Sequence, residues 1–137
     1  NTFFHGHSYT ANALGCTVAR ASLALLQDSG EKKRREILEK NLRQLSQEFW
    51  KHPHVGDVRQ EGTILAVEIV ADRKSRKAFP STERRGARIC QTAQGLGLLT
   101  RPIGDVLILM PPYSTTPEEL EQMVTALRKA IVKELPA

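Results

Sequence analysis

Residues 97–124 read GLLTRPIGDVLILMPPYSTTPEELEQMV, and the first half of this stretch has the pattern of a β-hairpin. Short apolar runs at 96–101 and 105–110 stand on either side of the sequence Pro-Ile-Gly-Asp at 102–105. Proline and glycine favour tight turns because each suits a backbone conformation that turns require. The pattern therefore predicts two short strands that are joined at residues 102–105.

The second half of the same stretch has the pattern of a helix start. Thr116 takes the N-cap position, Pro117 the first helical position and Glu119 the third, which together form a capping box. Apolar side chains then recur at helical spacing, at Leu120, Val124, Leu127 and Ile131. A final helix is therefore predicted after the strand pair.

The residues before this stretch predict a second strand pair and another helix. Strands are expected at 58–59 and 64–70, joined by a turn at Glu61-Gly62, because apolar side chains alternate along the longer run. The polar loop ADRKSRKAFPST follows it. A helix is then expected from about 83 to 94, before the glycines that end it.

Two helices are predicted at the beginning of the chain. The first, 12–27, is apolar on nearly all sides, which is typical of a helix buried between domains or subunits. The second, 31–51, has one apolar stripe, and the sequence HPHVGD at 52–57 ends it. The element order is α-α-β-β-α-β-β-α, so the predicted class is α+β: two helices, then a small, mainly antiparallel sheet backed by helices.

Composition limits the class of protein. The chain has 137 residues with a net charge of +5, and 26% of them are charged and 40% hydrophobic, as in one ordinary globular domain. No apolar run has the length of a membrane span, and no signal peptide is recognisable, so no membrane partner is expected. Two cysteines suit a reduced, cytoplasmic protein. The chain begins with Asn, and we expect it to be a piece of a longer protein.

Two histidine pairs, His5-Gly-His7 and His52-Pro-His54, are candidates for metal binding, because imidazole is a good zinc ligand. The acidic or thiolate third ligand would have to come from elsewhere, and nothing in the sequence points to it. No metal is therefore predicted. Ser8 beside these histidines also lacks an acid to orient a base and a nucleophile-elbow glycine pattern, so it is not predicted to act as a nucleophile.

The basic runs KKRR at 32–35 and DRKSRK at 72–77 are the features that would suggest nucleic acid as a partner. Neither run contains the interleaved aromatic side chains on which bases stack. The first run also lies on the wet side of an amphipathic helix. Solvated surface is the favoured interpretation, and no nucleic-acid partner is predicted.

Two positions remain as candidates for binding an anion. Ser8 and Thr10 precede the first helix, where hydroxyls and backbone N–H groups form an anion site or serve as a simple N-cap. Arg101 lies just before the predicted turn, where we expect Leu98 and Leu99 to anchor its strand in the core. An arginine held on a rigid hairpin can bind a carboxylate through two parallel hydrogen bonds, or it can be an ordinary surface residue.

The sequence FFHGHSYTANALGC at 3–16, together with 97–124, resembles the C-terminal part of class III, fold-type I aminotransferases, which use pyridoxal 5'-phosphate. The resemblance covers essentially the whole chain. It implies that residues 1–30 are a segment from the large-domain and dimer-interface side with a linking helix. Residues 31–137 would be the small C-terminal α+β domain of that fold.

The resemblance also implies roles for four residues. His7 and Ser8 would contact the cofactor phosphate of the other subunit in a homodimer, with Ser8 as the hydroxyl donor. Gly6 would lie where the backbone approaches the substrate, and Arg101 would hold the substrate carboxylate. Because some relatives have proline in place of His7, its contact would be made by the backbone alone.

The resemblance places the Schiff-base lysine and the aspartate that pairs with the cofactor ring before Asn1. Such a lysine needs a desolvated setting to lower its pKa, and the lysines of this chain stand in amphipathic helices and a polar loop. No catalytic residue is therefore assigned within the chain. A fragment of this extent is expected to be inactive alone.

The block RPIG…LMPPY favours, within the class, the members of biotin biosynthesis. These transfer the amino group of S-adenosylmethionine to 8-amino-7-oxononanoate, giving 7,8-diaminononanoate, and the amino donor remains open between S-adenosylmethionine and lysine. Two alternatives also remain open. One is another class III aminotransferase, acting on ornithine, acetylornithine, 4-aminobutyrate or an amine; the other is a non-catalytic interaction domain.

Overall fold

A computed structural model describes residues 12–136 of the chain. The predicted site residues Gly6, His7 and Ser8, with His5, lie outside the described residues. The chain divides into two compact units, residues 1–34 and residues 35–137.

The first unit contains α1 (Ala13–Gln27) and the beginning of α2 (Ser29–Ser46). The side chain of Asn12 caps α1 by accepting a hydrogen bond of 2.8 Å from the Gly15 N–H. Asp28 caps α2 in the same way, accepting from Gly30 at 2.8 Å and from Glu31 at 3.0 Å. No residue of α1 is buried, so the described residues of its own unit do not provide the burial predicted for this apolar helix.

The second unit is built on a four-stranded sheet with the order β1-β2-β4-β3, in which every neighbouring pair is antiparallel. The α+β class and the antiparallel sheet are thus confirmed. Its strands are β1 (Val55–Glu61), β2 (Ile64–Ile69), β3 (Pro102–Ile103) and β4 (Val106–Leu109). The helical elements are the rest of α2, η1 (Gln47–Lys51), η2 (Ser81–Glu83), α3 (Arg85–Gly95) and α4 (Pro117–Glu134).

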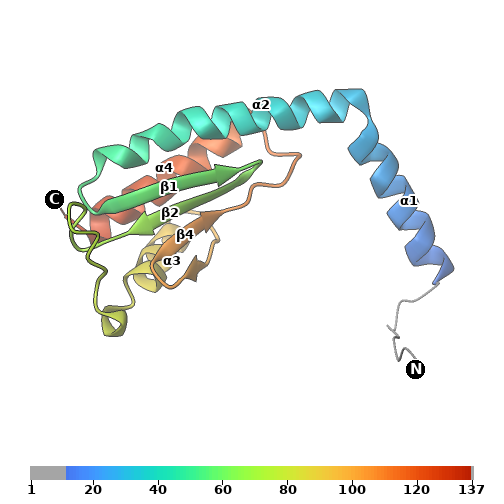
Figure 1. Cartoon of the computed structure of the whole chain (residues 1–137). Coiled ribbons are helices and arrows are strands. Elements are labelled where there is room, and N and C mark those ends of the chain that lie inside the picture. The colour runs from blue at the N-terminus through green and yellow to red at the C-terminus, as the bar shows by residue number, and fades with distance from the viewer. Residues whose placement is uncertain (1–11, 137) are drawn as a thin grey trace, which may run out of the picture. The chain divides into compact units, whose positions relative to one another are not determined.

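One face of the sheet forms the core. Side chains alternate between the faces of a strand, and the buried ones are Leu65, Val67 and Ile69 of β2 with Leu107 and Leu109 of β4. Helices α3 and α4 lie against this face, and α2 contributes two buried leucines to the same core (Figure 1). Within this unit, no described helix covers the opposite face, where the exposed side chains of Ile64, Ile103 and Met110 lie.

The capping box of the last helix is confirmed. The Thr116 side chain accepts a hydrogen bond from the Glu119 N–H at 3.2 Å, and the Glu119 carboxylate accepts from the Thr116 N–H at 2.8 Å. These two bonds satisfy backbone donors that the first turn of a helix otherwise leaves unpaired. The sequence thus predicted the first residue of α4 correctly.

The strand predicted at 96–101 is wrong. The Leu98 N–H bonds back to the Ala93 carbonyl at 3.0 Å, and Gly97 has a φ of +89°, so these residues end α3 and do not extend a sheet. The strand that pairs with β4 is instead Pro102–Ile103, so the predicted turn at 102–105 is also wrong at its first two residues. Leu98 is buried as expected, but Leu99 is 83% exposed and does not anchor anything in the core of this unit.

The start of α3 also differs from the predicted start near residue 83. A short η2 turn comes first, and α3 begins at Arg85 after Arg84, whose φ is +49°. The strand predicted at 58–59 is longer, because β1 runs the full length of β2 as Val55–Glu61. Both differences lie at boundaries and leave the order of the elements unchanged.

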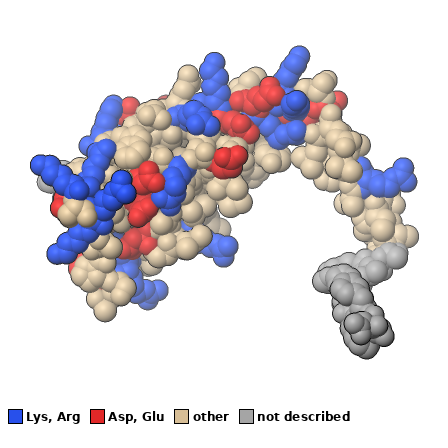
Figure 2. All heavy atoms as spheres, viewed as in Figure 1, with Lys and Arg blue, Asp and Glu red and all other residues tan. Residues whose placement is uncertain are grey.

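The two basic runs lie on solvated surface among acidic side chains, as Figure 2 shows for α2. Arg34 pairs with Glu31 at 2.8 Å in the first run. In the second, the Asp72 carboxylate accepts hydrogen bonds from the Lys74 and Ser75 N–H groups, which closes a tight turn. No described helix is both long enough and apolar enough to cross a membrane.

Candidate functional site

Arg101 stands immediately before β3 and is exposed. Among residues 12–136, none makes a hydrogen bond or ion pair with its guanidinium group. Strand alternation places Arg101 on the same side as Ile103, two residues later, which lies on the face of the sheet away from the helices. As far as residues 12–136 are concerned, the hydrogen-bonding groups of Arg101 are thus available to a ligand.

The backbone on either side of Arg101 is held by β4. On one side, the Thr100 hydroxyl donates a hydrogen bond to the Ile108 carbonyl. On the other side, Pro102 pairs with Leu107 in the antiparallel ladder. Because both neighbours are attached to a strand with a buried face, Arg101 is presented from a rigid position, as recognition of a carboxylate requires.

The turn of the hairpin is attached to two further elements. The Ile69 N–H of β2 donates to the Asp105 carbonyl at 2.9 Å, and the Gly86 N–H of α3 donates to the Asp105 carboxylate at 2.9 Å. Gly104, with a φ of +60°, supplies the left-handed conformation that the turn needs. The sequence did not single out Gly86, since its only signal was a glycine in the first turn of a predicted helix.

Arg59, on the uncovered face, is paired with carboxylates of the protein itself. It lies 2.6 Å from Asp57 and 2.8 Å from Glu68, and the hydrogen bonds to Glu68 and Asp57 hold the pKa of Arg59 above its usual value. Arg101 has no such partner among residues 12–136. Within the described part of the chain, an external acid would therefore meet an unpaired guanidinium group at Arg101 and a paired one at Arg59.

No lysine of the chain suits covalent binding of a carbonyl cofactor. All eight side chains are exposed, namely those of Lys32, Lys33, Lys40, Lys51, Lys74, Lys77, Lys129 and Lys133. A lysine that forms a Schiff base with such a cofactor needs a desolvated setting, which none of these side chains has. No lysine of the chain is therefore a candidate for a Schiff-base residue.

The second histidine pair has a structural role. The ring of His52 lies 2.9 Å from the Leu135 carbonyl through Nε2 and 3.2 Å from the His54 N–H through Nδ1. The His54 ring bonds to the Val70 carbonyl at 3.0 Å. Among the residues that the structure describes, no three potential ligands gather to hold a metal ion.

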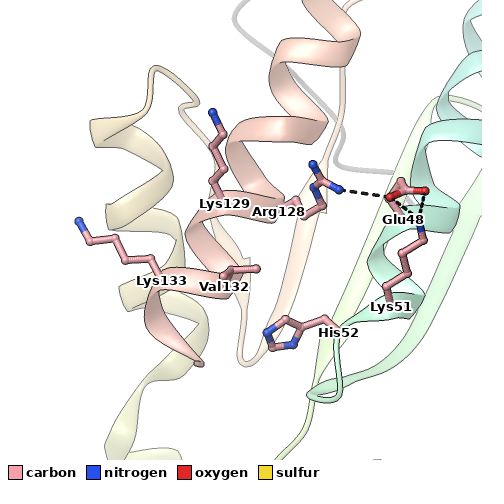
Figure 3. A pocket seen from close by; sticks show the side chains of 7 residues that line it. All are labelled: Glu48, Lys51, His52, Arg128, Lys129, Val132 and Lys133. Carbon is pink, nitrogen blue, oxygen red and sulfur yellow. Dashed lines mark hydrogen bonds and ion pairs between the residues drawn. The ribbon is translucent and has the colours of Figure 1, made fainter. Parts of the chain in front are cut away.

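A cavity of about 380 Å³ lies beside His52 (Figure 3). In it, Glu48 of η1 binds Lys51 at 2.7 Å and Arg128 of α4 at 3.2 Å, and these bonds lower the pKa of Glu48. Arg101, the predicted substrate-binding residue that the structure describes, does not line it. Glu48, Lys51 and Arg128 are paired with one another, and both ring nitrogens of His52 are bound to backbone.

The environment of His52 predicts a pH effect on stability. Burial lowers the pKa of His52 below its ordinary 6.5, although the bond to the Leu135 carbonyl opposes this shift. The unfolded chain then binds more protons than the folded one between the two pKa values, so stability is full above about pH 6.5 and falls as the pH drops through the folded-state value.

This effect is measurable by urea unfolding between about pH 7.5 and pH 5. His52→Gln keeps a side-chain donor for the Leu135 carbonyl but does not titrate. The wild type should therefore lose more stability than His52→Gln over this range. Equal pH slopes in the two proteins would contradict the prediction.

Comparison with known proteins defines the class. The profile of the class III aminotransferase family matches residues 1–131, and the chain belongs to this family. The chain is 42% identical, over 96% of its length, to the adenosylmethionine-8-amino-7-oxononanoate aminotransferase of Anoxybacillus flavithermus. The enzyme of the same name from Geobacter sulfurreducens is also 42% identical over 95% of the chain.

The solved structures agree with the fold. The crystal structure of adenosylmethionine-8-amino-7-oxononanoate aminotransferase from Methanocaldococcus jannaschii matches 96% of the chain with a TM-score of 0.88 and 32% identity. A PMP-bound aminotransferase from Vibrio fluvialis matches with a TM-score of 0.89 at 27% identity. The chain spans only 29% of the Anoxybacillus relative and 30% of the Methanocaldococcus chain, so it corresponds to under a third of such a protein.

Proposed function

We propose that the protein containing this chain transfers the amino group of S-adenosylmethionine to the ketone of 8-amino-7-oxononanoate, with pyridoxal 5'-phosphate as cofactor. The observation that carries the proposal is an exposed arginine, Arg101, on a hairpin held by β4, β2 and α3. Relatives that are 42% identical over nearly all of the chain have the name of this enzyme, which supports the choice of substrates.

Arg101 would bind the substrate carboxylate. A guanidinium group is planar and offers two parallel N–H donors that match the two oxygens of a carboxylate. Both proposed substrates carry a carboxylate, so one arginine serves both halves of the reaction. Arg101 has no ion-pair partner among residues 12–136, whereas Arg59 is paired with Asp57 and Glu68. This difference favours Arg101 as the carboxylate-binding residue.

The beginning of the chain would contribute to the cofactor site of a partner subunit. We propose that Ser8 donates its hydroxyl, and His7 its backbone N–H, to the cofactor phosphate of the other subunit in a homodimer. Gly6 would let the backbone approach the substrate. When bound, the cofactor supplies the electron sink for the chemistry at the substrate's amine-bearing carbon; these residues only hold and orient it.

The two units of the chain would then have different surroundings. Residues 1–30 would belong to the large-domain and dimer-interface side, which would supply the cover that α1 lacks among the described residues. The uncovered face of the sheet, with Arg101 and Ile103, would face the substrate. We also propose a cytoplasmic location, because the exposed Cys16 is a free thiol, which suits a reducing compartment.

A substrate panel on the full-length protein tests the function. We expect amino transfer to 8-amino-7-oxononanoate from S-adenosylmethionine, or from lysine as the alternative donor, and little activity on ornithine, acetylornithine or 4-aminobutyrate. Preference for one of the latter would replace the proposal with the other class III assignment. The 137-residue chain alone is expected to be inactive, and borohydride reduction with pyridoxal phosphate should label none of its eight exposed lysines stoichiometrically.

A further inference from the structure

We propose that Asp105 is a positioning residue for Arg101, which acts by attaching the hairpin turn to the first turn of α3. The inference rests on the proposed role of Arg101 as the carboxylate-binding residue. Asp105 itself is not assigned a contact with substrate. Its function is to determine where the Arg101 guanidinium lies on the uncovered face of the sheet.

Asp105 makes two bonds to two different elements. Its carboxylate oxygen Oδ1 accepts from the Gly86 N–H of α3 at 2.9 Å, and its backbone carbonyl accepts from the Ile69 N–H of β2 at 2.9 Å. One residue therefore fixes the turn in two directions, along the sheet and toward the helix. Arg101 lies only four positions before it on the same hairpin.

The bond to Gly86 has no competitor at the helix start. Arg84, the residue at the N-cap of α3, makes no side-chain capping hydrogen bond, so a first-turn N–H is capped from a distant part of the chain. A carboxylate at this end of a helix is also stabilised by the helix dipole. Gly86 is buried, which makes an unpaired N–H there costly.

The turn and the helix are in direct contact at this point. A Cβ added to Gly86 would lie 2.3 Å from the Gly104 carbonyl oxygen, 3.0 Å from the Pro102 Cβ and 3.1 Å from the Asp105 Cα. Only a residue without a side chain allows this approach. The bond from the Gly86 N–H to the Asp105 carboxylate is therefore the polar contact of an interface between the turn and α3 that otherwise consists of closely packed backbone.

Loss of the hydrogen bond between Asp105 and Gly86 should displace the Arg101 side chain from its binding position. A displacement of about 1 Å at a binding group is enough to lower a rate by roughly 100-fold, because charge pairs depend on geometry. Binding of the carboxylate should suffer, whereas interactions with the rest of the substrate should not. A purely structural role would instead lower stability and affect all substrates alike.

The test uses the full-length enzyme and two substrates, the acid and an analogue without the carboxylate. Asp105→Ala should lower the ratio of kcat/KM for acid over analogue by about tenfold, with an unchanged cofactor absorbance spectrum. Asp105→Asn, whose amide oxygen still accepts from Gly86, should retain most of the wild-type ratio. If Asp105→Ala does not fold, Asp105→Glu takes its place, because the extra methylene pushes the turn from α3 and should lower the same ratio.

Asp28→Ala is the matched control, because Asp28 also caps a helix by accepting from a glycine N–H, at 2.8 Å. It should leave the ratio unchanged. The inference is overturned if Asp105→Ala and Asp105→Glu both keep the wild-type ratio while Arg101→Lys lowers it. If Arg101→Lys itself leaves the ratio unchanged, the proposed role of Arg101 fails, and the inference falls with it.

Discussion

Arg101→Lys in the full-length enzyme is expected to reduce kcat/KM for both carboxylate substrates, with a loss of about 2–4 kcal/mol in transition-state stabilisation. This is the energy typically lost when one partner of a buried charge pair is truncated. Such a loss corresponds to a decrease in kcat/KM of roughly 30- to 1,000-fold. The reason is geometric, since a lysine ammonium is a single point charge and cannot make the two parallel bonds of a guanidinium group. Steady-state kinetics with each substrate in turn provides the measurement.

Stability and cofactor binding should be nearly unaffected by Arg101→Lys. Arg101 is exposed and has no hydrogen-bond or ion-pair partner among the described residues, so its loss removes no contact of this fold. A substrate analogue without the carboxylate should react at nearly the wild-type rate. If the acid and the analogue lose the same factor, Arg101 is a structural hairpin residue and another group holds the carboxylate.

Gly86→Ala is expected to destabilise the protein by about 3 kcal/mol, near the upper end for adding one methyl group to a packed interior. The new Cβ would lie 2.3 Å from the Gly104 carbonyl oxygen, and this neighbour is backbone, so no side-chain rotation relieves the clash. The better helix propensity of alanine offsets only about 1 kcal/mol of the cost. Urea unfolding of the variant and the wild type measures the difference.

Gly95→Ala provides the control within the same helix. A Cβ at Gly95 meets nothing within 4 Å, and its φ is not in the left-handed region. This substitution should be neutral or stabilise the protein by up to about 1 kcal/mol. Similar changes in stability for the two variants would contradict a specific clash between a side chain at position 86 and the hairpin.

The sequence was sufficient wherever a local pattern determines local structure. The capping box at Thr116 and Glu119 consists of hydrogen bonds between residues three positions apart, so the residue types at these two positions predict the hydrogen bonds. The alternation at Leu65, Val67 and Ile69 likewise predicts which face of β2 is buried. Arg101 was found as a candidate because turn-forming residues follow it directly, and the family resemblance then gave it a role.

The sequence was insufficient to predict which of two equally apolar segments forms a strand of the sheet. The run at 96–101 looks as much like a strand as 105–110 does, yet Leu99 is exposed while Leu107 and Leu109 are buried. What distinguishes them is pairing, because β4 lies beside β2 whereas residues 96–98 bond back to α3. Hydrogen bonding to a neighbouring strand is not encoded in the periodicity of one segment.

The sequence by itself thus determined the order of the elements, the class of the fold, the family and a short set of candidate binding residues. Only the tertiary structure decided how Arg101 is held. The bond from Gly86 to Asp105 joins residues that are 19 positions apart, and the contact between Gly86 and Gly104 exists only because α3 packs against the hairpin. Such contacts depend on the packing of whole elements in space, which a local pattern of residues does not specify.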